Sequence, residues 1–90
     1  MIIISYDIQD NKLRSRFNKY IRRFGFRLQY SVYQIENSQK VLDNISADIT
    51  NKFEKVFSES DSVIIFNLSN TCKITRFGYA KNDDESIIIV

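Results

Sequence analysis

A chain of 90 residues with 43% hydrophobic and 27% charged residues is typical of one globular domain, and we assign residues 1–90 to a single domain. Its single cysteine excludes an intrachain disulfide, and the absence of histidine excludes a Cys/His zinc site and a histidine general base. The net charge of +2 conceals an asymmetry, because residues 11–30 hold no acidic residue and seven basic ones, which predicts a surface for a polyanion: Lys12, Arg14, Arg16, Lys19, Arg22, Arg23 and Arg27.

The first element is a β-branched apolar run, residues 2–4 with Tyr6, that stops at Asp7. A run this short predicts a buried central strand. The start becomes charged too soon for a signal peptide, and no apolar run approaches the ~20 residues of a membrane-spanning helix. We therefore expect a cytoplasmic protein that makes no membrane contact.

A helix is predicted next, because five apolar residues recur on one face of a 3.6-residue period: Leu13, Phe17, Tyr20, Ile21 and Phe24. Asp10 precedes the pattern, where a carboxylate can accept backbone N–H bonds as the N-cap. Gly25 follows the last apolar position, and we expect it to end the helix in the left-handed conformation.

Residues 26–36 are predicted to be extended, because Phe26, Leu28 and Tyr30 alternate with polar residues. The alternation then slips, since Val32 and Tyr33 are both apolar and adjacent. A bulge within one strand explains the slip, and so does a tight reversal between two short strands. The sequence leaves both explanations open.

A second helix is predicted from a cap at Ser38 to about residue 57, with the apolar stripe Val41, Leu42, Ile45, Ile49, Phe53 and Val56.

Strands are predicted over 62–68, over 72–79 and at the terminal residues 87–90. If residues 26–36 reverse, the order is the β-α-β-β-α-β pattern of an α+β ferredoxin-like fold with extra C-terminal strands. The apolar end invites pairing, so we expect segment 70–90 to be an extension that pairs with the partner chain in a two-fold homodimer.

Three segments together resemble the small CRISPR-associated endoribonuclease family, the non-integrase subunit of the spacer-acquisition machinery. They are the strand end Tyr6-Asp7-Ile8 with the following basic helix, residues 25–32 (GFRLQYSV), and residues 61–66 (DSVIIF). The resemblance covers residues 1–68 in order. It implies a ferredoxin-like homodimer that is a magnesium-dependent endonuclease for single-stranded RNA or duplex DNA. It also implies that the dimer bridges two dimers of the CRISPR integrase subunit while foreign DNA is held for insertion.

The resemblance also assigns site residues. The positions matched to activity or nucleic-acid contact are Tyr6, Asp7, Arg14, Arg16, Arg27, Ser31 and Tyr33. Tyr33 departs from the more usual phenylalanine, and Gln34 stands where an acidic residue often follows. Segment 70–90 matches poorly.

Asp7 is the candidate catalytic residue and metal ligand. In a chain without histidine any metal would be bound by oxygens, which points to magnesium, manganese or calcium. The resemblance implies Mg²⁺, with Mn²⁺ as an alternative, and magnesium often takes only one or two carboxylates. A two-fold dimer would bring two Asp7 side chains to one ion, which would activate a bound water and stabilise charge on the phosphate. The competing interpretation is a strand-end aspartate that caps a turn.

The basic cluster, including Arg22 and Arg23, is predicted to bind phosphate, because unpaired like charges repel one another and Arg suits bidentate phosphate contact. A solvated polar helix face is the competing interpretation. Tyr30 and Tyr33 could stack on nucleic-acid bases. The competing interpretation is that they lie in the core or in a dimer contact, as aromatic residues of a strand usually do.

Two functions of different classes follow. One is a DNA-binding, integrase-bridging adaptor, and the other is a metal-dependent phosphodiesterase in which the Asp7 pair holds the ion and Arg14, Arg16 and Arg27 position the strand. Both can hold for one protein, and the adaptor role dominates if cleavage is silent. A ferredoxin-like RNA-binding module that is unrelated to CRISPR and lacks catalysis is the remaining alternative.

Overall fold

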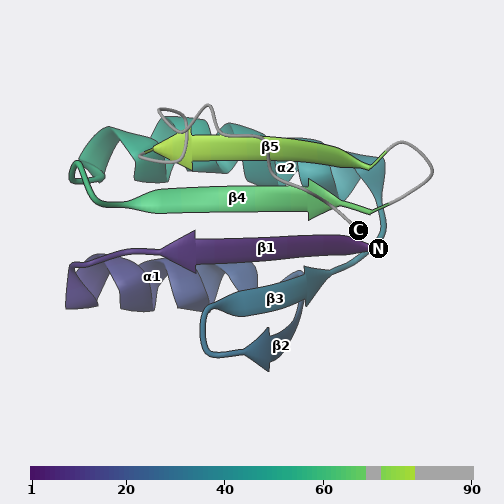
Figure 1. The fold of residues 1–90 in the computed structure, drawn as a ribbon, viewed down its shortest axis with the longest axis horizontal. Helices are drawn as coiled ribbons and strands as arrows, with labels where there is room; N and C mark the ends of the chain where they lie inside the picture. The colour runs from purple at the N-terminus through teal and green to yellow at the C-terminus, as the bar shows by residue number, and fades with distance from the viewer. Residues whose placement is uncertain (69–71, 79–90) are drawn as a thin grey trace.

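The structure, a computed structural model, describes residues 1–68 and 72–78 of the chain. Its elements follow the order β1 (Ile2–Asp7), α1 (Asn11–Ile21), β2 (Gly25–Gln29), β3 (Val32–Ile35), α2 (Gln39–Asp48), β4 (Ser62–Asn67) and β5 (Lys73–Gly78). The five strands form one antiparallel sheet in the order β2-β3-β1-β4-β5 (Figure 1). The predicted α+β class and its β-α-β-β-α-β order are confirmed, with β5 as an additional edge strand.

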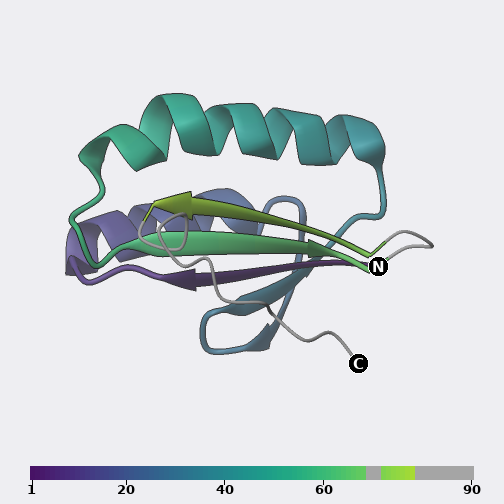
Figure 2. The same cartoon turned by 45° about the horizontal axis from the view of Figure 1, so that its top comes forward.

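Both helices cover the same face of the sheet (Figure 2). β1 lies in the middle, and its pleat sends Ile2, Ile4 and Tyr6 into the helix-covered core. Ile3 and Ser5 fall on the other face and are half-buried. The prediction of a buried central strand is therefore confirmed.

α1 begins where the sequence predicts and ends earlier than expected. The Asp10 carboxylate accepts from the Leu13 N–H at 2.8 Å, which confirms the N-cap. The helix ends at Ile21, and Gly25 instead opens β2, with no left-handed φ, so the expected glycine C-cap is wrong. Glycine is needed there because a Cβ would lie 1.9 Å from the carbonyl oxygen of Gln34 on β3.

Residues 26–36 contain both a chain reversal and a bulge, the two explanations for the break in their apolar–polar alternation. The chain reverses at Tyr30 and Ser31 between β2 and β3. The register also shifts between Arg27 and Gln29, so that Leu28 is an extra, bulged residue. Edge strand β2 leaves large apolar side chains exposed, including Phe26 at 58%.

The second helix is confirmed from its Ser38 cap, whose hydroxyl accepts from the Val41 N–H at 3.3 Å. It continues beyond α2 as a π-helical turn, Ile49–Phe53, and a 3₁₀ turn, Glu54–Val56. On an α-helix, residues spaced four apart point about 40° away from one another, so a stripe with that spacing gradually turns away from the core. A π turn holds more residues per turn and reduces this rotation, which keeps Ile49 and Phe53 in the core. Val56 was expected in the same stripe but is exposed, because the tighter 3₁₀ turn rotates it away from the core.

Strands over 62–68 and 72–79 are confirmed as β4 and β5, and β5 pairs with β4 of the same chain. The predicted terminal strand 87–90 lies outside the described residues. Among residues 1–68 and 72–78, no helix is long and apolar enough to cross a membrane.

Candidate functional site

Four of the residues that the sequence assigned to nucleic acid meet between α1 and the sheet. The side-chain oxygen of Asn18 on α1 accepts hydrogen bonds from the hydroxyls of Tyr6 and Tyr33 and from Arg27, with the Tyr6 and Arg27 bonds both 3.3 Å long. Arg27 also lies over the Tyr33 ring, 5.8 Å from its centroid. Tyr6, Asn18 and Arg27, but not Tyr33, line a small hollow of about 90 Å³ at the surface, together with Arg14, Ser15 and Tyr30.

The rings of Tyr6 and Tyr33 are part of the core, with 5% and 2% of their surface exposed. Burial is the main cause that raises the pKa of Tyr6, so its hydroxyl is a protonated donor at neutral pH. Both tyrosines donate their hydroxyls to the Asn18 oxygen, while their rings are packed in the core. Tyr30, in contrast, is 74% exposed at the hairpin tip, which leaves its ring accessible for base stacking.

Arg14 fixes the loop that joins β1 to α1. Its guanidinium donates to the carbonyl oxygens of Ile8 and Gln9, at 2.8 and 3.3 Å, and to the side-chain oxygen of Asn11. Part of its hydrogen-bonding capacity is thus satisfied within the chain, while its positive charge remains at the hollow.

Asp7 is exposed at the end of β1, and one of its carboxylate oxygens accepts from the Gln9 side-chain amide at 3.0 Å. The loop behind it is held by Asp61, which is only 1% exposed. One Asp61 oxygen accepts from the Gln9 N–H at 2.8 Å and the other from the Ser58 N–H at 2.7 Å. Asp61 therefore fastens the Asp7 loop to the start of β4.

Asp7 and the hollow lie on opposite faces of the sheet. Tyr6 and Asp7 are neighbours on β1, and the pleat directs successive side chains to opposite sides. The structure therefore does not bring Asp7 together with Arg14, Arg27 and Tyr33 within one protomer.

The donor set at Asp7 fits a magnesium ion that keeps most of its water. An exposed carboxylate with no ion-pair partner among the described residues is a hard oxygen ligand, and magnesium often takes only one or two of these. In residues 1–68 and 72–78, no three acidic or cysteine side chains gather into a cation site. Water, a phosphate or a second chain can supply further oxygen ligands at Asp7.

The remaining predicted arginines lie on α1 (Arg16) and in the turn that follows it (Arg22 and Arg23). Arg16 packs over the Phe53 ring at 5.2 Å and donates to the Lys52 carbonyl at 3.3 Å, a contact to the π-helical turn. Arg23 lies over the rings of Tyr20 and Phe24 at 6.0 and 5.6 Å, and Arg22 is exposed. Ser31 is half-buried in the hairpin turn, where its carbonyl accepts from the Tyr6 N–H.

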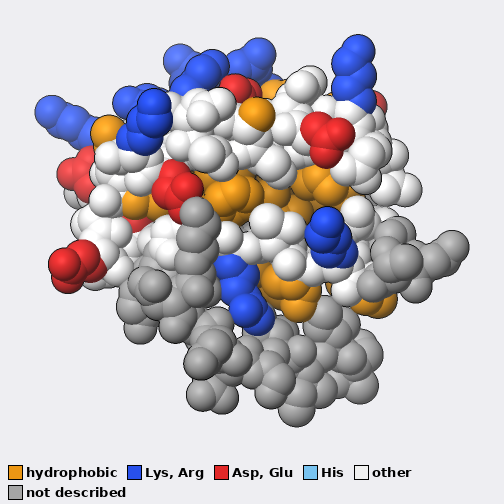
Figure 3. Space-filling model, turned by 90° about the horizontal axis from the view of Figure 1, so that it is seen from above, with side chains coloured by type: hydrophobic (Ala, Val, Ile, Leu, Met, Phe, Trp, Pro, Cys, Tyr) orange, Lys and Arg blue, Asp and Glu red, His pale blue; other side chains and the backbone are white. Residues whose placement is uncertain are grey.

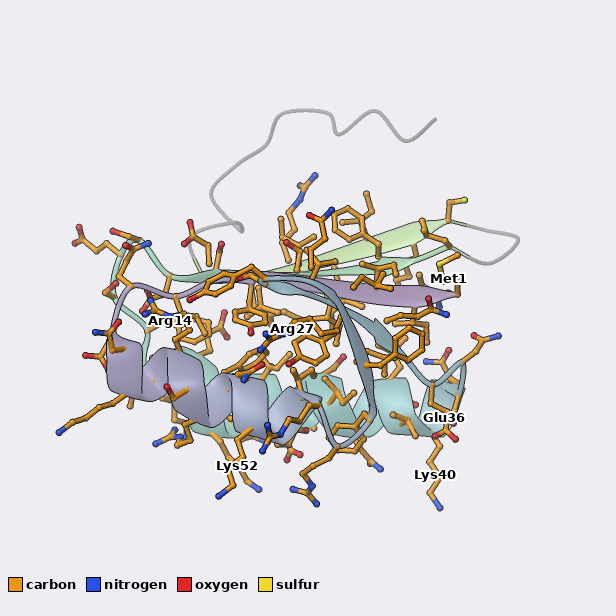
Figure 4. All side chains as sticks on the ribbon, turned by 90° about the horizontal axis from the view of Figure 1, so that it is seen from below. Met1, Arg14, Arg27, Glu36, Lys40 and Lys52 are labelled. Carbon is orange, nitrogen blue, oxygen red and sulfur yellow. The ribbon has the colours of Figure 1, made fainter. Side chains whose placement is uncertain are left out.

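Cations dominate the outer surface of the helical layer. Figure 3 shows Lys and Arg side chains gathered along the helices, and Figure 4 shows Lys40 and Lys52 projecting away from the sheet. In the described part of the chain, no carboxylate forms an ion pair with Lys12, Lys19 or Arg22. Lys52 pairs with Asp48 at 3.5 Å, whereas these three cations can bind a polyanion without first breaking an ion pair to a described residue.

The sheet order, the two helices on one face and the interrupted α2 define a ferredoxin-like α+β protein with an additional edge strand. A family model described as CRISPR associated protein Cas2 matches residues 1–76. The chain belongs to the Cas2 family, which confirms the resemblance seen in its three segments.

A curated relative from Methanospirillum hungatei JF-1 supports the same assignment. It is named CRISPR-associated endoribonuclease Cas2 2 and is 27% identical over 90 residues, spanning 98% of this chain and 97% of that protein. No solved structure matches significantly. Family membership decides against the alternative of an RNA-binding module unrelated to CRISPR.

Asn18 is the residue of this cluster that the sequence did not single out. It follows Arg14 by four residues on α1, beside the buried stripe of Leu13, Phe17 and Ile21. That spacing places Arg14 and Asn18 on one flank of the helix, so a polar flank bordering the apolar stripe was the available signal.

Proposed function

We propose that the chain acts in CRISPR spacer acquisition as a homodimer that binds duplex DNA and bridges dimers of the integrase subunit. We further propose that it has a family-type, metal-dependent endoribonuclease activity, with DNA cleavage as the alternative. The family match over residues 1–76 is the observation that carries this proposal. The cationic helical layer supports the binding part, and the exposed Asp7 supports the cleavage part.

The sheet face opposite the two helices supports dimerisation. Ile3, Phe66 and Ile74 are cross-strand neighbours on the face that the helices leave open, and Ile64 lies on the same face. A 90-residue domain gains much stability from covering such a surface with a second copy. Sedimentation of the purified protein should therefore give twice the mass of one chain.

Sequence-tolerant binding through phosphates is expected from the helical layer. Affinity should fall steeply with salt, because each neutralised phosphate of duplex DNA releases counterions and adds about −0.9 to the slope of log K against log[salt]. Lys19 and Arg22 are exposed, lie three residues apart on the chain and have no ion-pair partner in the described part of the chain.

Replacing both Lys19 and Arg22 with glutamine should lower that slope by about 1.8. Fluorescence anisotropy of a labelled duplex between roughly 50 and 200 mM salt measures it. The control replaces Lys73 with glutamine. Lys73 is exposed on β5, outside the helical layer, and its loss should leave the slope nearly unchanged, whereas Lys19→Gln alone should lower it by about 0.9. Equal losses in the two single variants would show that binding follows overall charge and not the helical surface.

Asp7→Asn separates cleavage from binding. The amide keeps the shape of the side chain but loses the negative charge that holds a divalent cation. Because outer-shell substitutions alone cost about 10–100-fold, cleavage of single-stranded RNA in Mg²⁺ or Mn²⁺ should fall by at least about a hundredfold. Duplex affinity and integration with the integrase subunit should persist.

Gel analysis of cleavage products and a reconstituted integration assay check the two outcomes. Glu36→Gln is the matched control, since it removes another exposed carboxylate that is distant in the fold. Undiminished cleavage in Asp7→Asn would remove Asp7 from the catalytic role. Lost integration with intact cleavage would overturn the separation of adaptor and nuclease.

A further inference from the structure

The hollow between α1 and β2 is cationic and small. It is lined by Tyr6, Arg14, Ser15, Asn18, Arg27 and Tyr30, with two guanidinium groups and no carboxylate. Its volume of about 90 Å³ is well below the roughly 300–1,000 Å³ of typical ligand pockets, which suits a single phosphate group and not a whole nucleotide. Figure 4 shows Arg14 and Arg27 turned toward the space between the helix and the sheet.

Asn18 holds this hollow together from the helix side. Its oxygen receives three donors from three different strands: Tyr6 on β1, Arg27 on β2 and Tyr33 on β3. An amide NH₂ group cannot accept these bonds, so the donors fix the orientation of the Asn18 amide. Its nitrogen has no hydrogen-bond partner among the described residues and remains a donor at the wall of the hollow.

The choice of amide over carboxylate matters for charge. An aspartate at this position would accept the same three bonds, but it would form an ion pair with Arg27 and cancel its charge. Asparagine orients the guanidinium and leaves its positive charge available, and a guanidinium with both charge and spare donors suits phosphate oxygens.

We propose that Asn18 is a positioning residue that sets Arg27 at the mouth of the hollow, where its guanidinium binds one phosphate of the nucleic-acid backbone. This proposal rests on the proposed nucleic-acid binding function and adds the place where one phosphate binds. Arg27 makes the phosphate contact, and Asn18 acts mainly through Arg27.

Three variants test the assignment with a fluorescein-labelled random-sequence duplex. Arg27→Gln should weaken binding about tenfold, as expected for one charge-assisted contact, and lower the salt slope by about 0.9. Asn18→Asp should do the same while keeping the fold, because it retains the acceptor and neutralises Arg27. Asn44→Asp, the same charge change at an exposed position of α2, should have less than about half of that effect on the slope.

A double-mutant cycle distinguishes positioning from general support of the fold. Asn18→Ala should weaken binding in the wild-type background and have little further effect in the Arg27→Gln background. A loss that persists undiminished without Arg27 would overturn the proposal, and so would wild-type binding by both Asn18 variants. Circular dichroism verifies that each variant is folded, and Asn18→Asp carries the test if the alanine variant unfolds.

The outcomes also separate this inference from the proposed function. A wild-type protein that binds no duplex at any salt concentration would defeat the proposed binding function itself. A wild-type protein that binds, with Arg27→Gln or Asn18→Asp unchanged in affinity and slope, would defeat only the phosphate site at the hollow.

Discussion

Phe17→Ala is expected to lower the free energy of unfolding by about 3–5 kcal/mol, the usual cost of removing a fully buried phenylalanine. Phe17 is 0% exposed and joins three elements. Its ring meets Tyr6 of β1 edge-on with centroids 4.9 Å apart, and it meets Phe53 of the π-helical turn at 5.0 Å. Alanine would leave a cavity between the sheet and both helical segments.

The loss is large because small domains have net stabilities of only about 5–15 kcal/mol. At roughly 4–8 °C per kcal/mol, the melting temperature should fall by roughly 12–40 °C. Thermal denaturation followed by circular dichroism measures it. Phe26→Ala is the matched control, because Phe26 is 58% exposed, and it should change stability by less than about 1 kcal/mol. Comparable losses in both variants would contradict the assignment of Phe17 to the centre of the core.

Elements whose apolar residues recur with a strong period were predictable from the sequence, because the burial of one face determines both that period and the type of secondary structure. β1 and the start of α1 follow directly from an apolar run and a helical stripe, and Asp10 and Ser38 cap as their chemistry indicates. Periodicity fails where backbone geometry changes. Val56 lies in the apolar stripe of the sequence but leaves the core because the helix tightens to a 3₁₀ turn.

The candidate site was predictable as a set of residues but not as an arrangement. The resemblance selected Tyr6, Asp7, Arg14 and Arg27, yet the pleat of β1 separates Asp7 from the others. Asn18 requires knowledge that three strands converge on one helix face, which no local pattern contains. The structure thus divides one predicted site into an exposed carboxylate and a cationic hollow on opposite faces of the sheet.

Because Asp7 and the hollow lie on opposite faces of the sheet, the proposed cleavage and binding depend differently on dimerisation. An exposed carboxylate can join its counterpart only across a second chain, whereas the hollow is complete within one protomer. Phosphate binding at the hollow is therefore expected from a single protomer, and a metal site made of two Asp7 carboxylates only from a dimer. Binding without cleavage is the expected state of any variant that folds but fails to dimerise.

Gly25 shows how a non-local contact can be mistaken for a local signal. A glycine just after an apolar helix stripe is a common C-cap, and that was the expectation. In the fold, Gly25 instead faces Ile35 in the β2–β3 register, and a Cβ at this position would lie 1.9 Å from the Gln34 oxygen and 2.9 Å from the Ile35 Cα. Both atoms belong to the backbone of a paired strand, so neither can turn aside as a side chain would.

Gly25→Ala is therefore expected to separate the first residues of β2 from β3 and to destabilise the protein by roughly 2–4 kcal/mol, at or above the usual cost of overpacking. Because β2 carries Arg27, the variant should also lose duplex affinity about as much as Arg27→Gln does, even at temperatures where the rest of the sheet remains folded. Urea denaturation measures the stability, and amide hydrogen exchange should show faster exchange confined to β2 and β3.

Gln29→Ala provides the comparison, since Gln29 lies at the other end of β2 and is exposed. It should leave stability within about 0.5 kcal/mol of the wild type and keep duplex affinity. If Gly25→Ala proved as stable as Gln29→Ala, the close approach of β2 and β3 would be wrong, and with it the place of Arg27 beside Asn18. Stability and affinity should fall together in Gly25→Ala because one strand provides both the edge of the sheet and the arginine of the hollow.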